Sequence, residues 1–248
     1  MEREYACIFI DAFYFPIKRA TTAQQAIFVA LAITPSGHRE ILGYWIPGGN
    51  ESASNWEEIL RNLKKRGFES VDFIIADGLT GIQGAILRSF PRAKYQYCIL
   101  HATRTCLNKV RSLDKKAISA NMKKIYQAEN VMKAKESWLE FQIRWQKIYP
   151  KVIKFWRDHF KQLIQFMVLP HELRQYVYTT NWVESSHKEI KRRLKVMEQF
   201  HSEQSAEGIL YLLYKRKNEN YVAGINHWKR SYAEYKVAEE NGEFRQVM

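Results

Sequence analysis

Three acidic residues stand where a carboxylate could do chemistry. Asp11 interrupts the apolar stretch CIFIDAFYF, where an ionised carboxylate is costly unless it is paired or binds a metal. Strand alternation places four other residues on its face: Cys7, Phe9, Phe13 and Phe15. Asp77 ends the apolar run FIIAD, and Glu184 opens the basic stretch that runs to residue 195. The carboxyl ends of strands are where α/β sheets place their chemistry, so Asp77 is well positioned for it.

Each acid also has a structural interpretation, which the sequence leaves open. Asp11 could pair with a buried Arg or Lys. Asp77 could cap a helix that begins near Leu79, or start the turn ADGLTG. Glu184 follows Asn181 by three residues and could be the far half of a capping box.

The stretch around Glu184, TTNWVESSHKEIKRRLK, predicts a helix with two faces. Helical spacing puts Glu184 on one stripe with Lys188, Lys191 and Lys195. A neighbouring stripe would pack on the sheet: Val183, Ile190, Leu194 and Met197. The helix could therefore offer a carboxylate to a metal and cations to a phosphate backbone. Four residues are the predicted phosphate contacts: Lys188, Lys191, Arg192 and Arg193. A solvated basic face is the alternative.

Three carboxylates from separate elements suit Mg²⁺ or Mn²⁺, which are hard cations that prefer oxygen ligands. Two such ions can clamp the attacking and leaving oxygens of a phosphodiester displacement. That chemistry requires clustered acids within a positive surface, and the sequence supplies both.

The elements that would position these acids predict an α/β fold, a mixed sheet flanked by helices. The pattern of residues 4–47 predicts three strands joined by short turns. It then predicts a helix, a strand, a second helix and a further strand, up to about residue 100. Strand signals vanish from about 102 to 175, which predicts an all-helical block. The predicted divisions are 1–103 for the first part of the core, 104–178 for a helical insertion, 179–222 for C-terminal helices of the core, and 223–248 for a loosely ordered polar tail.

Composition limits the partners and the compartment. The 248 residues are 46% hydrophobic and carry a net charge of +13, which indicates a polyanionic partner, with nucleic acid as the first candidate. Three cysteines make no disulfide framework, so a reducing compartment is expected. We expect no membrane span and no signal peptide. The chain has no nucleophile elbow, which argues against a Ser-His-Asp hydrolase.

Several stretches together resemble the catalytic region of Mutator-type bacterial insertion-sequence transposases: FIDAFY, IIADGLTGIQGAI, FPRAKYQYCILHATR and TTNWVESSHKEIKRR. The resemblance runs from about residue 8 to about residue 218. It implies a ribonuclease H-like fold interrupted by an all-helical insertion. It also implies that Asp11, Asp77 and Glu184 are the catalytic acids of a DDE transposase. These three residues would bind two Mg²⁺ or Mn²⁺ ions, and double-stranded DNA at the element ends and the target would be the partner.

The resemblance extends to CILH, where Cys98 and His101 match a CxxH motif of the family's active-site region. His101 and Arg104 are accordingly predicted to contact DNA. The family tends to have HxxRN here, and Thr105 stands in place of the Asn. A structural zinc site is not expected, because only Cys106 adds a nearby ligand.

Relatives carry an N-terminal helical region that recognises the element's ends, and this chain begins almost at the first catalytic strand. We therefore expect weak or absent end recognition, with nonspecific DNA binding that falls steeply with salt. The resemblance also implies a dimer or larger assembly on DNA and a place in the bacterial cytoplasm with the nucleoid. Two alternatives stay open: a metal-dependent nuclease of the same fold, and a non-catalytic or truncated remnant that binds DNA nonspecifically.

Overall fold

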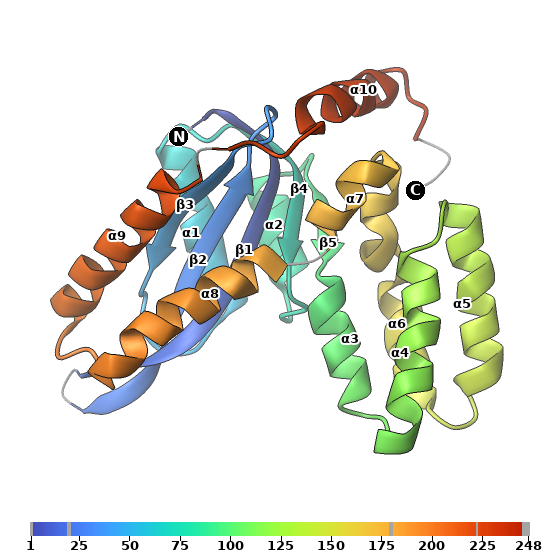
Figure 1. The fold of residues 1–248 in the computed structure, drawn as a ribbon, viewed down its shortest axis with the longest axis horizontal. Helices are drawn as coiled ribbons and strands as arrows, with labels where there is room; N and C mark the ends of the chain where they lie inside the picture. The colour runs from blue at the N-terminus through green and yellow to red at the C-terminus, as the bar shows by residue number, and fades with distance from the viewer. Residues whose placement is uncertain (1, 19–20, 179–180, 222, 245–248) are drawn as a thin grey trace. The chain divides into compact units, whose positions relative to one another are not determined.

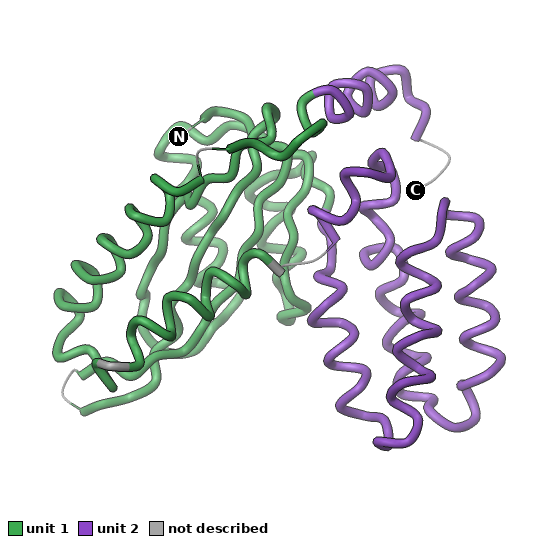
Figure 2. Tube along the Cα trace, viewed as in Figure 1, with its two compact units in different colours: residues 1–94, 180–229 green, residues 95–179, 230–248 purple. Residues whose placement is uncertain are grey.

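A computed structural model of the chain describes residues 2–18, 21–178, 181–221 and 223–244, except for the side chains of residues 181 and 196. The chain divides into two compact units (Figure 2), residues 1–94 with 180–229 and residues 95–179 with 230–248. Each unit is described by itself.

A mixed five-stranded sheet has the strand order β3-β2-β1-β4-β5 (Figure 1). The three strands predicted within residues 4–47 are β1 (Glu4–Lys18), β2 (Thr22–Ile33) and β3 (Arg39–Trp45), and they form an antiparallel meander. β4 (Ser70–Ala76) runs parallel to β1, and β5 (Lys94–Tyr97) takes the edge position. The prediction of a mixed α/β sheet flanked by helices is confirmed.

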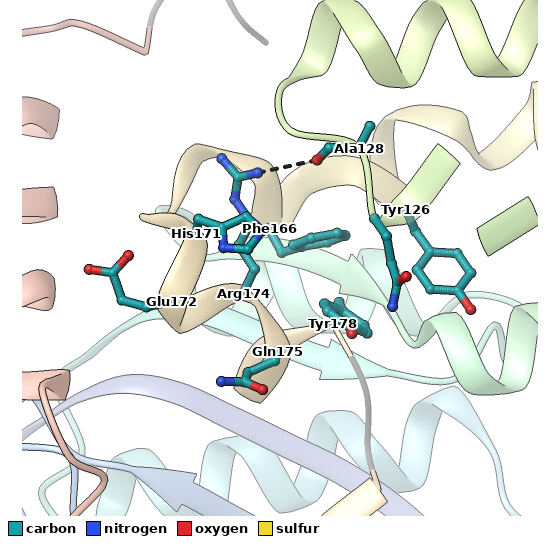
Figure 3. A pocket seen from close by; sticks show the side chains of 9 residues that line it. Tyr126, Ala128, Phe166, His171, Glu172, Arg174, Gln175 and Tyr178 are labelled. Atoms are coloured by element: carbon teal, nitrogen blue, oxygen red, sulfur yellow. Dashed lines mark hydrogen bonds between the residues drawn. The ribbon is translucent and has the colours of Figure 1, made fainter. Parts of the chain in front are cut away.

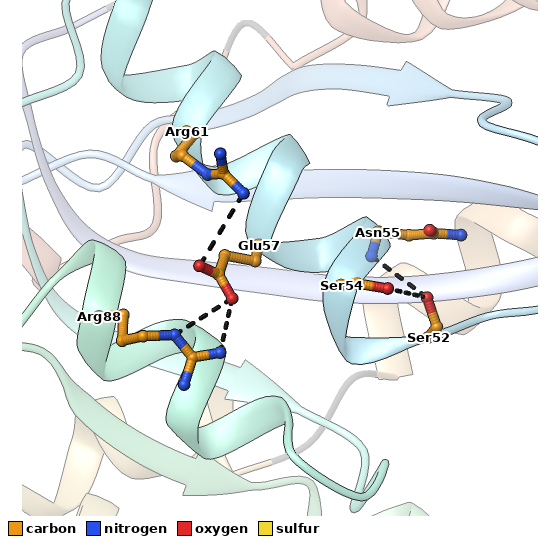
Figure 4. A network of polar contacts seen from close by, with 6 residues as sticks. All are labelled: Ser52, Ser54, Asn55, Glu57, Arg61 and Arg88. Atoms are coloured by element: carbon orange, nitrogen blue, oxygen red, sulfur yellow. Dashed lines mark hydrogen bonds and ion pairs between the residues drawn. The ribbon is translucent and has the colours of Figure 1, made fainter.

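Helix α1 (Ala53–Lys65) packs on the sheet face that carries Phe28, whose ring centroid lies 4.9 Å from that of Trp56. Its sequence dictates this packing, because helical spacing gathers the buried residues Trp56, Ile59, Leu60 and Leu63 on one side. Ser52 caps the helix by accepting a hydrogen bond from the Asn55 amide (Figure 4). Exposed ion pairs from Glu57 to Arg61 and Arg88 tie α1 to α2 (Ile82–Ser89).

The opposite face of the sheet carries α8 (Asn181–Leu194) and α9 (Glu203–Glu219), with the short η2 (Lys195–Met197) after α8. Phe9 and Phe13 of β1 contact α8 through Trp182 and His187, at ring distances of 5.1 and 5.0 Å. The predicted sheet-facing residues Val183, Ile190 and Leu194 are buried, and Met197 is half-buried. The predicted two-faced helix is thus present.

The second unit contains the predicted all-helical block. Its helices are α3 (Ile99–Leu107), α4 (Ser112–Tyr126), α5 (Val131–Trp145), α6 (Pro150–Ile164), η1 (Gln165–Val168) and α7 (His171–Val177). Contacts join α3 to α4, α4 to α5, α5 to α6, and α6 back to α3, which makes a four-helix bundle. Trp156 and Phe141 form its core, as expected for aromatic residues at helical spacing.

Arg174 of α7 stabilises the end of this bundle. Its guanidinium donates to the carbonyls of Met167, Leu169, Ala128 and Glu129. Beside it lies a pocket of about 350 Å³ lined by both polar and aromatic side chains (Figure 3). No residue of the predicted site lines this pocket.

The prediction of a loosely ordered tail after residue 222 is wrong for most of that segment. Helix α10 (Trp228–Glu240) forms there, with Trp228, Tyr232 and Tyr235 buried. The three aromatics follow spacing i, i+4, i+7, which is the signal of an amphipathic helix. Across the described parts of the chain, no helix has the length and apolar character that crossing a membrane requires.

Candidate active site

Asp11 lies on the face of β1 that packs against α8. Its side chain is 11% exposed, and His187 Nδ1 lies 3.4 Å from Asp11 Oδ2. The Ala12 amide donates to Asp11 Oδ1 over 3.0 Å. The partner of Asp11 is therefore a histidine and not a buried Arg or Lys. The side chain of His187 is itself 7% exposed.

Asp77 directly follows β4, where the pairing of β4 with β1 stops. We call this place, the end of β4 beside the middle of β1, the sheet edge. The parallel pairing of β1 with β4 ends at Phe9 opposite Ile75, and each aspartate stands two residues further on. Because side chains alternate along a strand and neighbouring strands lie about 4.8 Å apart, this register directs both carboxylates to one side of the edge. Asp77 Oδ1 also accepts from the Leu79 amide over 3.2 Å, so the turn interpretation holds as well.

Glu184 lies in the first turn of α8 and is half-buried. It stands between Trp182, which contacts Phe9, and His187, which contacts Asp11. Helix α8 therefore places Glu184 along the stretch of β1 that bears Asp11. The capping-box alternative depends on the Asn181 side chain, which lies outside the described residues.

Glu51 is a fourth acid near this edge, and it is absent from the predicted site. The pKa of Glu51 is raised to about 7, first by burial and then by the charges of Asp77 and Asp11, which places its carboxyl near both. Trp56 Nε1 donates to Glu51 Oε1 over 2.7 Å, and this bond opposes the rise. Its position directly before the Ser52 cap fixes it at the start of α1. No local sequence pattern marks it.

His187 is the second residue absent from the predicted site, because it lies in the basic stretch that was expected to face a polyanion. The structure buries it between Asp11 and Phe13. Its Nε2 has no hydrogen-bond partner within the described part of the chain. A signal was available, since Val183, His187 and Ile190 follow helical spacing i, i+4, i+7 and put the histidine on the apolar stripe.

The oxygen donors suit a hard divalent cation in kind, and the register gathers two of them at one edge. Among the described residues, however, no group of three or more His, Cys, Asp or Glu side chains is placed to hold an ion. Glu184 and the aspartates would therefore have to converge on an ion as it binds.

The predicted phosphate contacts all lie on the exposed side of α8, but they differ in their partners. Lys188 and Arg192 are exposed. Lys191 Nζ lies 5.3 Å from the centre of the Phe13 ring, and Arg193 pairs with Glu189 at 3.4 Å. Glu189 also accepts from Lys217 over 2.5 Å, which explains the lowered pKa of that carboxyl.

His101 and Arg104 lie on α3 of the second unit, the first half-buried and the second exposed. Cys98 precedes α3 and is fully buried, as is Cys106 on the helix. The predicted roles of His101 and Arg104 in DNA contact stay predictions.

The fold and these acids define a class of protein, an α/β domain in which two neighbouring parallel strands bring carboxylates side by side. A sequence profile described as "Transposase, Mutator family" matches residues 1–224. The chain belongs to this family.

Two relatives agree with the family assignment. The transposase of insertion sequence IS1201 from Lactobacillus helveticus is 35% identical over 202 residues, which cover 82% of this chain and 54% of the relative. The transposase of IS905 from Lactococcus lactis is 34% identical over 218 residues, which cover 88% and 55%. The chain thus spans about half the length of these curated relatives.

Among solved structures, the catalytic domain of the Mos1 mariner transposase aligns with this chain. The alignment covers 64% of this chain and 77% of the Mos1 chain. The identity is 12% and the TM-score is 0.26.

Proposed function

We propose that the chain is the catalytic region of a DDE transposase, which cleaves DNA at the ends of a mobile element and joins the freed 3′-hydroxyl to a target strand. The observation that carries the proposal is the register of β1 and β4. It brings Asp11 and Asp77 to one edge of the sheet, where α8 carries Glu184 along the same face. Family membership supports the reaction class.

Asp11, Asp77 and Glu184 are the residues that would hold Mg²⁺ or Mn²⁺, with two ions expected. Bound there, the ions would activate the attacking oxygen and stabilise the departing one. The protein's own contribution is to bring the acids together from a strand, a strand end and a helix.

Other residues of the first unit would orient the site and its substrate. His187 would hold the Asp11 carboxylate, because its Nδ1 faces Oδ2 and Phe13 fixes the ring. Lys188 and Arg192 would contact phosphates, since both are exposed on the helix that carries Glu184. Lys191 and Arg193 would also contact phosphates, once Lys191 moves off the Phe13 ring and Arg193 breaks its ion pair with Glu189.

The proposed partner is double-stranded DNA, which is supported by the net charge of +13 and by the family. The same proposal includes an assembly on paired ends and a place with the bacterial nucleoid.

The test compares the parent chain with Glu184→Gln in nicking and strand-transfer assays with Mn²⁺ or Mg²⁺. The matched control is Glu189→Gln, which makes the same change five residues along the same helix. We expect Glu184→Gln to lose activity by about 100-fold or more while folding and DNA binding persist, and the control to stay close to the parent. An active Glu184→Gln protein would remove Glu184 from the site.

Precut DNA ends separate the proposal from its alternatives. A transposase joins a precut 3′-hydroxyl to a target duplex, whereas a nuclease of the same fold only cuts. A chain that binds DNA and does neither, with any metal, would be a non-catalytic remnant.

A further inference from the structure

The positive charge of the chain is concentrated in the helical bundle of the second unit. Residues 95–179 contain sixteen Lys and Arg against six Asp and Glu, so this stretch carries +10 of the chain's formal +13. Arg104, a predicted DNA contact, is one of these cations, and the others have no predicted role. A concentration of this size within one small bundle calls for a partner of opposite charge.

The charge is unevenly distributed around the bundle. Residues 99–111 and 147–164, which include α3 and α6, contain eight cations and one acid, Asp158. Residues 112–145, which include α4 and α5, contain seven cations and four acids. The side formed by α3 and α6 therefore offers the stronger attraction to a polyanion.

Helix α6 presents its cations on one side because its other side is core. Helical spacing puts Lys151, Lys154, Arg157 and Lys161 on the arc opposite the buried Val152, Trp156 and Leu163, and all four cations are exposed. Only Asp158 interrupts the arc, and Lys154 pairs with it at 2.5 Å. At 1.5 Å per residue, Lys151 and Lys161 lie about 15 Å apart along the helix, a span of about four phosphates on one strand.

The end of α3 adds to this arc. Lys109 Nζ lies 5.7 Å from the centre of the Phe155 ring of α6, and that ring stacks on His159 at 4.6 Å. These contacts hold Lys109 beside the α6 cations. We define the α3–α6 basic face as Lys109, Lys151, Lys154, Arg157 and Lys161.

We infer that the α3–α6 basic face binds the sugar-phosphate backbone of duplex DNA, in addition to the cations of α8. Its rigid helical spacing and its single acid suit a regular row of phosphates, and it carries no base-reading geometry, so the binding is independent of sequence. The inference rests on the proposed function only for the identity of the polyanion.

The test measures binding alone, by fluorescence anisotropy of a labelled duplex with the full chain in EDTA. The variant is Lys151→Gln with Arg157→Gln and Lys161→Gln, which spares Lys154 and its ion pair. The matched control is Lys116→Gln with Lys123→Gln and Lys124→Gln, three exposed cations of α4. In the closed ring of contacts, α4 and α6 occupy opposite corners, so both variants lose three charges but from different sides.

We expect the α6 variant to bind the duplex about 10- to 100-fold more weakly, with a slope of log K against log salt lower by about 2–3. The α4 variant should stay within about threefold of the parent, and both should keep the parent's circular dichroism. Equal losses in the two variants, or none in the α6 variant, would overturn the inference, as would a parent that binds no duplex at all.

A parallel titration with double-stranded RNA tests the class of nucleic acid. A loss confined to RNA would overturn the assignment to DNA. Because no step of this experiment requires cleavage, a chain that proves inactive in strand transfer still tests the basic face, and the two failures remain distinct.

Discussion

Single residues at the sheet edge carry an electrostatic cost that the fold alone does not require. Glu51 lies near Asp77 and Asp11, and its raised pKa records both its burial and their charges. Like charges at close range destabilise one another in a partly buried setting. Such a cluster is expected where function, rather than stability, selects the residues.

Glu51 therefore predicts a dependence of stability on pH. Its pKa is raised from 4.5 to about 7, so its favourable contribution is present below pH 4.5 and is lost as pH rises through 7. Glu51→Gln keeps an oxygen that can accept from Trp56 but does not ionise. We expect the variant to match the parent near pH 4 and to exceed it at pH 8 by about 1–2 kcal/mol, because partial exposure reduces the full effect.

Urea unfolding in EDTA across this pH range checks the Glu51 prediction. Glu57→Gln is the control, since that acid lies nearby on α1 and pairs with the exposed Arg88. A stability difference between Glu51→Gln and the parent that does not grow with pH would contradict the argument.

His187 predicts an effect that passes through Asp11. His187→Leu keeps much of the packing on Phe13 but removes the polar contact to Asp11, whereas His187→Asn retains a donor. Since partners that orient a metal-binding group typically contribute about 10- to 100-fold, we expect the Leu variant to need that much more Mn²⁺ for half-maximal nicking. The Asn variant should lie nearer the parent. If both folded variants keep the parent's Mn²⁺ requirement, His187 is only a packing residue.

The two omissions at this scale have different causes. His187 was recoverable from the sequence, because its spacing puts it on the apolar stripe of α8. Glu51 was not, since its approach to Asp11 and Asp77 depends on where the chain after β3 crosses the sheet edge, and no local pattern encodes that. The predictions that Asp11, Asp77 and Glu184 are catalytic stay predictions.

Among the elements, those with a strong local pattern were predicted and those that depend on distant contacts were not. Alternation predicts the meander, the Ser52 cap predicts the start of α1, and an apolar run predicts β4. Helix α10 was missed because its charged residues and the preceding Gly224 obscured three aromatics at helical spacing. Trp228 at its start is buried against the β2–β3 turn, a contact that no window of the sequence contains.

That contact gives a prediction at the turn itself. Gly37 has φ +88°, and a Cβ there would lie 2.7 Å from Trp228 Cβ, so Gly37→Ala would meet both backbone strain and a clash. Gly67, at the end of α1, has φ +95° with open space around it, so Gly67→Ala would meet the backbone strain without a clash. We expect Gly37→Ala to cost about 3 kcal/mol and Gly67→Ala about 1 kcal/mol. If the two variants lose the same free energy of unfolding in chemical denaturation, Trp228 can move aside without a cost in stability.

At the scale of the whole molecule, positive charge is concentrated in one region of the sequence. The helical stretch 95–179 carries +10, while the acids of the proposed site belong to the first unit. The two proposals give two parts of the chain different tasks: the bundle would attract a polyanion, and the sheet edge would attract cations. Each task can be removed by substitution without touching the other.

Cation binding at the sheet edge should appear in the stability of the whole chain. An ion held by Asp11, Asp77 and Glu184 stabilises the native state by mass action and offsets the repulsion among these acids and Glu51. At a Mn²⁺ concentration of about 100 times Kd, the gain is about 2.7 kcal/mol, or about 5–10 °C in Tm for a chain of this size. Asp77→Asn should lose most of this shift and Glu189→Gln should keep it. An equal shift in all three proteins in differential scanning fluorimetry would place the ion elsewhere, and no shift in the parent would contradict the proposed metal site.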